Sequence, residues 1–236
     1  MSALVSLTFD DGLRCHFDQA VPILDQYGLP ATFFLTANDS PIHIDWHEHR
    51  DWRKIEWDAN DIQLLKGVVQ RGHEIGSHSA WHKDPDPDSP KFRTDFDPIF
   101  EAKESKNLIE GWMGMEIPSF CYPFCKKPAP LKNAVIDAGY TQARAGADAS
   151  YYSPLDSIDC FGVDCRLIRE NENVAEWVRT NCWHVLMFHG IGTLDDGWEP
   201  ITVAEFTRQM TELAKYRDSG AVEVVTFREG AKRLCR

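Results

Sequence analysis

Two acidic residues, Asp10 and Asp11, directly follow an apolar run over residues 3–9, and Gly12 comes next. Side chains alternate between the two faces of a strand, so neighbouring carboxylates can reach one site only where a strand ends and the chain turns. Glycine permits such a turn. The spacing therefore predicts two carboxylates at the carboxyl end of a strand.

Two histidines four residues apart, His78 and His82, can bind one metal ion from one side of a turn. One carboxylate and two imidazoles form a three-ligand set with a position left for water, which is typical of hydrolytic metal sites. The second carboxylate is then available as a general base. These residues predict a metal-dependent hydrolase.

The elements that must position these groups follow from alternating apolar and amphipathic runs. The predicted strands are 4–9, 31–36, 74–77, 119–123, 140–145, 160–163, 185–188 and 223–226. The predicted helices are 17–27, 58–71, 98–112, 130–138, 173–181, 202–216 and 228–234. Strands that alternate with helices predict a parallel sheet.

This element order predicts an α/β fold, a distorted (β/α) barrel of about seven to eight parallel strands. A doubly wound open sheet is the alternative. The 236 residues suit one domain over 1–236, because α/β barrels of this length are commonly single units. Several polar residues share a position at or just after predicted strand ends: Asp10, Asp11, His78, Asp164 and His189. In such barrels that face carries the active site.

The composition limits the kinds of binding partner that the chain can have. The chain has 25 Lys and Arg against 37 Asp and Glu, a formal charge of −12, which argues against a nucleic-acid partner. No apolar run reaches membrane-spanning length, and the start of the chain lacks a basic and apolar leader. We therefore expect a cytoplasmic protein, with a trimmed secreted form as the alternative; the oligomeric state does not follow from the sequence.

The seven cysteines are scattered and odd in number, so we expect them to be reduced rather than to form a disulfide framework. A zinc site from the pairs Cys121/Cys125 and Cys160/Cys165 is disfavoured, because both pairs lie in apolar runs. A competing histidine pair, His43 and His47, lacks a strand-end context.

The sequence resembles carbohydrate esterase family 4, the NodB-homology polysaccharide deacetylases, from about Leu4 to Leu234. The similar motifs are residues 8–12 (Thr-Phe-Asp-Asp-Gly), 78–82 (His-Ser-Ala-Trp-His), 30–35 (Pro-Ala-Thr-Phe-Phe-Leu) and 186–190 (Leu-Met-Phe-His-Gly). The resemblance implies a (β/α) barrel that removes acetyl groups from N-acetylated sugars or glycans by hydrolysis.

The resemblance also implies roles for single residues. A divalent metal, most often zinc, with cobalt, nickel or manganese as alternatives, would be held by Asp11, His78 and His82. Asp10 would be the general base, and His189 would protonate the leaving amine.

Two family motifs differ in this chain. The third motif normally opens with arginine, but here Cys121 stands before Tyr122-Pro123-Phe124, as in a Tyr-Pro variant branch. Arg144 is the first candidate to replace that arginine beside Asp10, and Arg166 is the second. In the fourth motif Asp164 is kept, but Cys165 stands where tryptophan is usual, so Trp198 or Trp183 is the candidate aromatic wall.

Further predictions complete the site. The backbone N–H of Phe124 would stabilise the oxyanion, and Asp164 would orient His189 and favour its protonated form. Tyr122, Met187 and Trp198 would contact substrate, with Met187 beside the acetyl methyl group. Two other functions stay open: an acetyl-ester or allantoinase-like ureide hydrolase on the same site, and a catalytically silent carbohydrate-binding protein.

Overall fold

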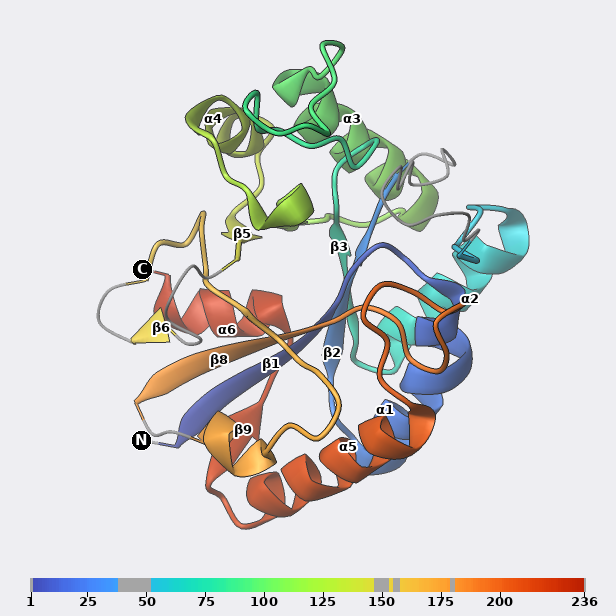
Figure 1. The fold of residues 1–236 in the computed structure, drawn as a ribbon, viewed down its shortest axis with the longest axis vertical. Coiled ribbons are helices and arrows are strands. Elements are labelled where there is room, and N and C mark those ends of the chain that lie inside the picture. The colour runs from blue at the N-terminus through green and yellow to red at the C-terminus, as the bar shows by residue number, and fades with distance from the viewer. Residues whose placement is uncertain (1, 38–51, 147–152, 155–157, 179–180, 236) are drawn as a thin grey trace.

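The structure is a computed structural model that describes residues 2–37, 52–146, 153–154, 158–178 and 181–235. The strands are β1 (Ala3–Phe9), β2 (Ala31–Leu35), β3 (Glu74–Ser77), β4 (Ser119–Cys121), β5 (Gln142–Arg144), β6 (Ser153–Pro154), β7 (Arg166–Leu167), β8 (Cys182–Phe188) and β9 (Val222–Val224). The α-helices are α1 (Val21–Tyr27), α2 (Ala59–Gln70), α3 (Pro98–Met113), α4 (Ala129–Asp137), α5 (Val203–Asp218) and α6 (Phe227–Leu234). The helices lie around the outside of the sheet (Figure 1).

The strands form one sheet in the order β5-β4-β3-β2-β1-β8-β6. Pairing is parallel from β5 to β8, and the longest ladder joins β1 to β8, from Leu4 opposite Trp183 to Phe9 opposite Phe188. The short β6 is antiparallel to β8, and β9 lies parallel to the first half of β1. This parallel arrangement brings the carboxyl ends of β1, β2, β3, β4 and β8 to one face.

A short segment links the two edges of this sheet. Val163 forms a parallel bridge with Arg144 of β5, and β7 pairs with β8. The hydrogen-bonded strands therefore follow a ring from β1 through β5 and this segment back to β8, which confirms the distorted α/β barrel. The predicted strand 160–163 is wrong in position. A turn from Asp159 to Gly162 occupies most of that range, and the strand of this segment is β7, which follows the bridge at Val163.

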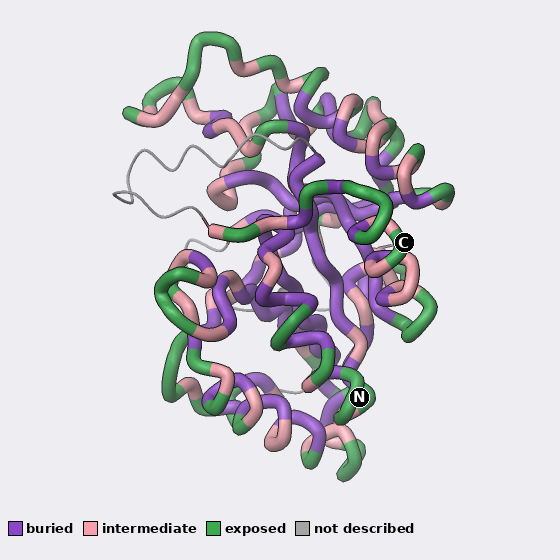
Figure 2. The backbone as a smooth tube through the Cα atoms, turned by 90° about the vertical axis from the view of Figure 1, so that its right-hand side faces the viewer, coloured by how far each residue is buried: buried purple, intermediate pink, exposed green. Residues whose placement is uncertain are grey.

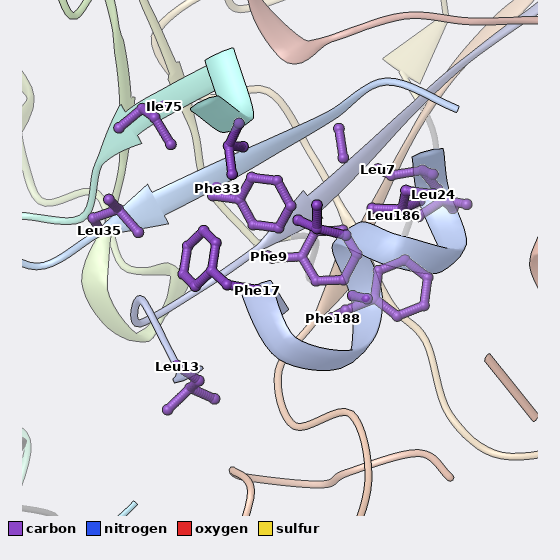
Figure 3. Close-up of a cluster of buried hydrophobic side chains, with 14 of the residues drawn as sticks. Leu7, Phe9, Leu13, Phe17, Leu24, Phe33, Leu35, Ile75, Leu186 and Phe188 are labelled. Atoms are coloured by element: carbon purple, nitrogen blue, oxygen red, sulfur yellow. The ribbon is translucent and has the colours of Figure 1, made fainter. Parts of the chain in front are cut away.

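The core lies between the inner strands and the helices that cover them. Phe9 stacks on Phe33 of β2 and on Phe188 of β8, with ring centroids 5.0 and 5.1 Å apart (Figure 3). The strands from β1 to β5 are buried along their length, and β8 is buried beyond its first residue, whereas exposed residues are concentrated on the outer helices and loops (Figure 2). Strands covered on both faces read as continuous apolar runs, which is why β1 and β8 were predictable.

Two of the predicted helices differ from expectation in type, and the others differ by one or two residues at their ends. The predicted helix 17–27 is a π-helical turn over His16–Ala20 followed by α1, and residues 174–178 of the predicted helix 173–181 form a 3-10 helix. Residues 179–180 lie outside the described part of the chain. None of the helices described has the length and apolar character needed to cross a membrane. That residues 1–236 form a single catalytic domain stays a prediction.

One cysteine expectation is wrong. Cys160 and Cys235 form a disulfide across 75 residues of sequence, with Cα atoms 5.7 Å apart. Cys15, Cys121, Cys125 and Cys165 are free thiols. The tertiary structure brings Cys235, the residue that follows α6, beside the turn at 159–162, which spacing along the sequence does not reveal.

Candidate active site

The two acidic residues emerge where β1 ends. The Asp10 N–H still donates to Phe188 O of β8 at 3.2 Å, so Asp10 continues the strand ladder. Asp11 then takes a left-handed conformation with φ 75°, and Gly12 follows with φ 67°. This turn brings both carboxylates to the same buried face of the sheet. A left-handed non-glycine residue is uncommon, and such strain is often found at functional sites.

His78 is held by both its backbone and its ring. Its N–H donates to Leu35 O of β2 at 2.8 Å, and its Nδ1 lies 2.9 Å from Cys121 O. A carbonyl oxygen only accepts, so the ring proton is on Nδ1, which leaves the Nε2 lone pair directed at Asp11. His82 follows a turn in which its N–H donates to Ser79 Oγ at 2.9 Å.

Three ligand atoms meet at this point. Asp11 Oδ1 lies 3.5 Å from His78 Nε2 and 3.4 Å from His82 Nε2. A tetrahedral zinc ion with nitrogen and oxygen ligands separates those atoms by about 3.3 Å, as its bond lengths require. Asp11 Oδ1 is buried and has no hydrogen-bond partner among the described residues. The spacing and the unsatisfied oxygen fit a divalent cation.

The electrostatics of the same groups also suit metal binding. Burial raises the pKa of Asp11, but the neighbouring imidazoles of His82, His189 and His78 outweigh it and hold the pKa below its usual range. Burial lowers the pKa of His82 to about 3. At neutral pH this part of the site therefore presents a carboxylate and a neutral imidazole, the protonation states that bind metals.

A second group of possible ligands, Asp10, His78 and Cys121, shares His78 with the first. Cys121 Sγ lies 2.7 Å from Arg144 Nη2, and burial raises the pKa of the thiol well above its usual value. A protonated thiol next to a guanidinium is a poor ligand for a cation. The Asp11, His78 and His82 set is the better fit.

Arg144 crosses from β5 to the second carboxylate. The side chain is fully buried; Nη2 donates to Asp10 Oδ2, and Nη1 donates to Thr8 Oγ1 at 3.1 Å. Burial raises the pKa of Asp10, but the Arg144 guanidinium, with His78 and His189, outweighs it and lowers that pKa. The alternative candidate, Arg166, instead pairs with Glu172 and Glu176 at 2.5 and 3.1 Å.

His189, just beyond β8, also lies near Asp10, with Nε2 3.9 Å from Asp10 Oδ2. Its Nδ1 has no hydrogen-bond partner in the described part of the chain, so the predicted bond from Asp164 is not formed. Asp164 lies between Val163, which is paired with β5, and β7, which is paired with β8, and it is not among the residues that line the cavity.

The expected protonation of His189 stays a prediction, and the burial of its ring acts against it. Burial lowers its pKa and outweighs the raising effect of Asp10 and Asp11. This lowered pKa favours the neutral imidazole of His189 at pH 7. Without a carboxylate on Nδ1, Asp10 and Asp11 only partly offset the loss of solvent around the ring.

A cavity of about 480 Å³ opens above these groups. The four predicted substrate residues, Tyr122, Phe124, Met187 and Trp198, all line it. The Phe124 ring lies 4.8 Å from that of His82, and Trp198 makes an edge contact with His189 at the same distance. Trp183, the alternative aromatic wall, instead lies in the core and stacks on Phe227.

Sequence reasoning missed part of this cavity wall. Asp84, Ser89 and Lys126 also line it, and the buried Asp84 holds the loop by accepting from Ser89 Oγ at 2.6 Å and pairing with Lys126 Nζ at 3.0 Å. The turn-forming segment 85–90 (Pro-Asp-Pro-Asp-Ser-Pro) was the available signal. Trp52 lines the cavity as well, whereas the pair His43 and His47 lies outside the described residues.

Comparisons with known proteins agree with this architecture. Residues 2–143 match the family model for polysaccharide deacetylases. One relative, the uncharacterized protein YlxY of Bacillus subtilis, is 31% identical over 123 residues. That match takes in 52% of this chain and 30% of the relative, so the chain spans less than a third of that protein's length.

Two solved structures share the fold over almost the whole chain. One is the Xyl-CE4 domain of a multidomain xylanase from the hindgut metagenome of Trinervitermes trinervoides, with a TM-score of 0.61, 18% identity and coverage of 99% of this chain and 91% of that one. The other is a family 4 acetyl xylan esterase from Clostridium thermocellum in complex with cobalt, with a TM-score of 0.58, 18% identity and coverage of 97% and 90%. The Tyr-Pro variant branch stays a prediction.

Proposed function

The chain belongs to the polysaccharide deacetylase family, and we propose that it is a metal-dependent hydrolase that removes acetyl groups from N-acetylated sugars or glycans. The observation that carries this proposal is the meeting of Asp11, His78 and His82 directly beside the Asp10–Arg144 pair. A ligand set next to a buried, ionised carboxylate is the arrangement that hydrolysis with an activated water needs.

Asp11, His78 and His82 would hold the cation, with zinc first and cobalt, nickel or manganese as alternatives. When bound, such a cation polarises an acyl oxygen and makes water more acidic. The hydrogen bond from His78 Nδ1 to Cys121 O keeps Nε2 free to act as a ligand.

Asp10 would take the proton from the attacking water. The Arg144 guanidinium keeps this buried carboxylate ionised and fixes its orientation through Oδ2. Its other oxygen, Oδ1, has no hydrogen-bond partner among the described residues, so it is available to accept that proton.

His189 would deliver a proton to the leaving nitrogen. Because the pKa of Asp10 is held low, the proton it takes is held weakly and can pass to His189 Nε2, 3.9 Å away. The neutral imidazole can accept that proton and then donate it to the nitrogen as the C–N bond breaks. No protonated histidine is needed at the start, and the predicted help from Asp164 is not required.

The cavity wall would position the acetylated sugar. We assign the oxyanion to the backbone N–H of Phe124, the acetyl methyl group to Met187, and a sugar face to Trp198, with Tyr122 closing the wall. Aromatic side chains offer apolar faces with large contact area, which suits the C–H faces of a sugar ring.

One observation favours a second candidate, hydrolysis of an acetyl ester. Because burial lowers its pKa, little of His189 carries a proton at neutral pH, and no hydrogen bond at Nδ1 among the described residues stabilises the protonated form. An alkoxide leaves more easily than an amide anion, so an ester needs less protonation. A small loss of activity in His189→Ala would favour the ester, whereas a large loss would favour the amide.

The test is acetate release from N-acetylated sugars, O-acetylated sugars and chitooligosaccharides. Metal-stripped protein is assayed with zinc, cobalt, nickel or manganese added back, beside the variants Asp10→Asn and His78→Ala. We expect metal-dependent release that both variants lose. A wild-type protein that binds none of these metals would overturn the proposal.

The cytoplasmic location stays a prediction. The disulfide between Cys160 and Cys235 argues against this location, because such bonds persist mainly in oxidising compartments.

A further inference from the structure

The two histidines of the ligand set are held in different ways. The ring of His78 is fixed by its bond to Cys121 O, and its backbone N–H is bound to β2. The ring of His82 has no such bond, because its Nδ1 is buried without a hydrogen-bond partner among the described residues. The position of His82 therefore depends on the backbone of the loop 79–82.

That loop has a conformation that needs support. Ser79 and His82 both have positive φ, 67° and 52°, which is unfavourable for residues other than glycine. Trp81, at the outer side of the loop, is 38% exposed, so apolar burial of its ring does little to fix the loop. Hydrogen bonds to the rest of the protein must therefore hold it.

Glu101 supplies two of these hydrogen bonds. Its carboxyl oxygen Oε2 accepts from the Trp81 N–H at 2.8 Å, and its carbonyl oxygen accepts from the Ala80 N–H at 3.1 Å. Glu101 is fully buried in the first turn of α3, where Asp97 caps the helix. One residue of a capped helix thus binds two consecutive amides that lead directly to His82.

We propose that Glu101 is a positioning residue that fixes His82 for metal binding, an inference that rests on the proposed metal site. Its carboxyl group sets the loop backbone, and the loop sets the direction of His82 Nε2 toward Asp11. Glu101 itself does not line the cavity and has no contact with the reacting groups.

The experiment measures zinc and cobalt affinity of the metal-stripped full chain by calorimetry, with the cobalt absorption spectrum as a report of ligand geometry. Glu101→Ala should lower affinity about 10- to 100-fold, the range seen when groups that orient metal ligands are removed, and should change the cobalt spectrum. Glu101→Gln keeps an oxygen that can accept the Trp81 N–H, so it should restore most of the affinity.

The matched control is Glu110→Ala on the same helix. Glu110 also accepts a backbone N–H, from Ile117 at 2.9 Å, but far from the loop 79–82. Glu110→Ala should lower the melting temperature of the metal-free protein and leave its metal affinity unchanged. If Glu101→Ala does not fold, Glu101→Asp serves instead, because its shorter side chain keeps the charge but withdraws from Trp81.

The outcomes separate the two proposals. If the wild type binds metal and the Glu101 variants bind it with the same affinity, the role of Glu101 is overturned and the metal site stands. Loss of affinity in Glu101→Ala and Glu110→Ala alike would show a general effect of α3 stability and would also overturn it. No metal binding by the wild type would overturn the metal site itself.

Discussion

Asp10 and Glu74 are both buried carboxyl groups of the same parallel sheet, at opposite ends of it. Glu74 begins β3, and both of its oxygens are satisfied by neutral donors: Ser119 Oγ at 2.5 Å on one, and Thr32 Oγ1 and the Arg228 N–H at 2.8 Å on the other. Asp10 follows β1 and faces Arg144 through one oxygen, while the other has no partner among the described residues.

The direction of the pKa shift separates the two groups. Burial raises the pKa of Glu74, because hydrogen bonds from neutral donors only partly offset the loss of solvent. Burial acts on Asp10 as well, but Arg144 and the two nearby histidines reverse it. A carboxyl group whose oxygens are both satisfied by neutral donors ties strands together, whereas one ion-paired to Arg144 with an unused oxygen is ready for proton transfer.

The largest difference is expected in catalysis. Asp10→Asn removes the proton acceptor but keeps the shape, so kcat for acetate release should fall by about 10²- to 10⁴-fold, the usual contribution of a general base. Glu74→Gln should leave kcat within about twofold, since Glu74 is at the far end of the sheet. Steady-state assays with metal present measure both, and equal losses would remove the distinction between the two ends.

The next effect is on stability at the catalytic end. Arg144→Met leaves Asp10 as a buried charge without its partner, which should cost about 3–5 kcal/mol in the free energy of unfolding. Arg166→Met, which removes a partly exposed ion pair, should cost about 1 kcal/mol or less. Urea unfolding of the metal-free protein gives both values; similar costs would mean that Asp10 does not depend on Arg144.

The third effect concerns Glu74, at the amino end of the sheet, and the pH dependence of the free energy of unfolding. Because the folded pKa of Glu74 is raised above its ordinary value of 4.5, the folded state holds this proton more tightly than the unfolded state. Its contribution to stability is present below pH 4.5 and is lost as pH rises through the folded pKa, with a slope of at most about 1.4 kcal/mol per pH unit for one proton.

Unfolding of metal-free wild type and Glu74→Gln between pH 4 and 7 tests this sign. The advantage of the wild type over the variant should shrink as pH rises. Any pH-independent cost of the substitution does not affect how this difference in the free energy of unfolding changes with pH. An advantage of the wild type that grows with pH would show that the folded state prefers the carboxylate form of Glu74.

The smallest effect is expected at the cavity wall. Trp198→Ala removes an edge contact with His189 and an apolar face, which should raise KM by several-fold, in line with about 1 kcal/mol for an aromatic contact. The matched change Trp183→Phe is in the core and should alter stability rather than KM. A kcat loss in Trp198→Ala without a KM change would instead place Trp198 in the orientation of His189.

Local patterns were enough to predict most strands. Residues 74–77 were placed without error, and β1, β2 and β8 differ from expectation by one to three residues at their ends. These are apolar runs buried on both faces, so the local sequence records their environment directly. Asp10, Asp11 and His78 could be placed at the carboxyl face for the same reason, because each directly follows such a run.

Contacts between distant segments needed the tertiary structure. The choice of Arg144 over Arg166 depends on which of two short strands lies across the barrel from Asp10, and no local signal records that. The failed contact between Asp164 and His189 and the support of His82 by Glu101 have the same origin.

The sequence by itself determined the class of fold, the two carboxylates at the end of β1 and the histidine pair that faces them, because burial, strand period and turn residues act over a few neighbouring positions. Only the tertiary structure decided which cation pairs with Asp10, that burial lowers the pKa of His189, and that Cys160 is bonded to Cys235. Those outcomes depend on distances and on the loss of solvent between segments tens to more than a hundred residues apart, and these exist only once the chain has folded.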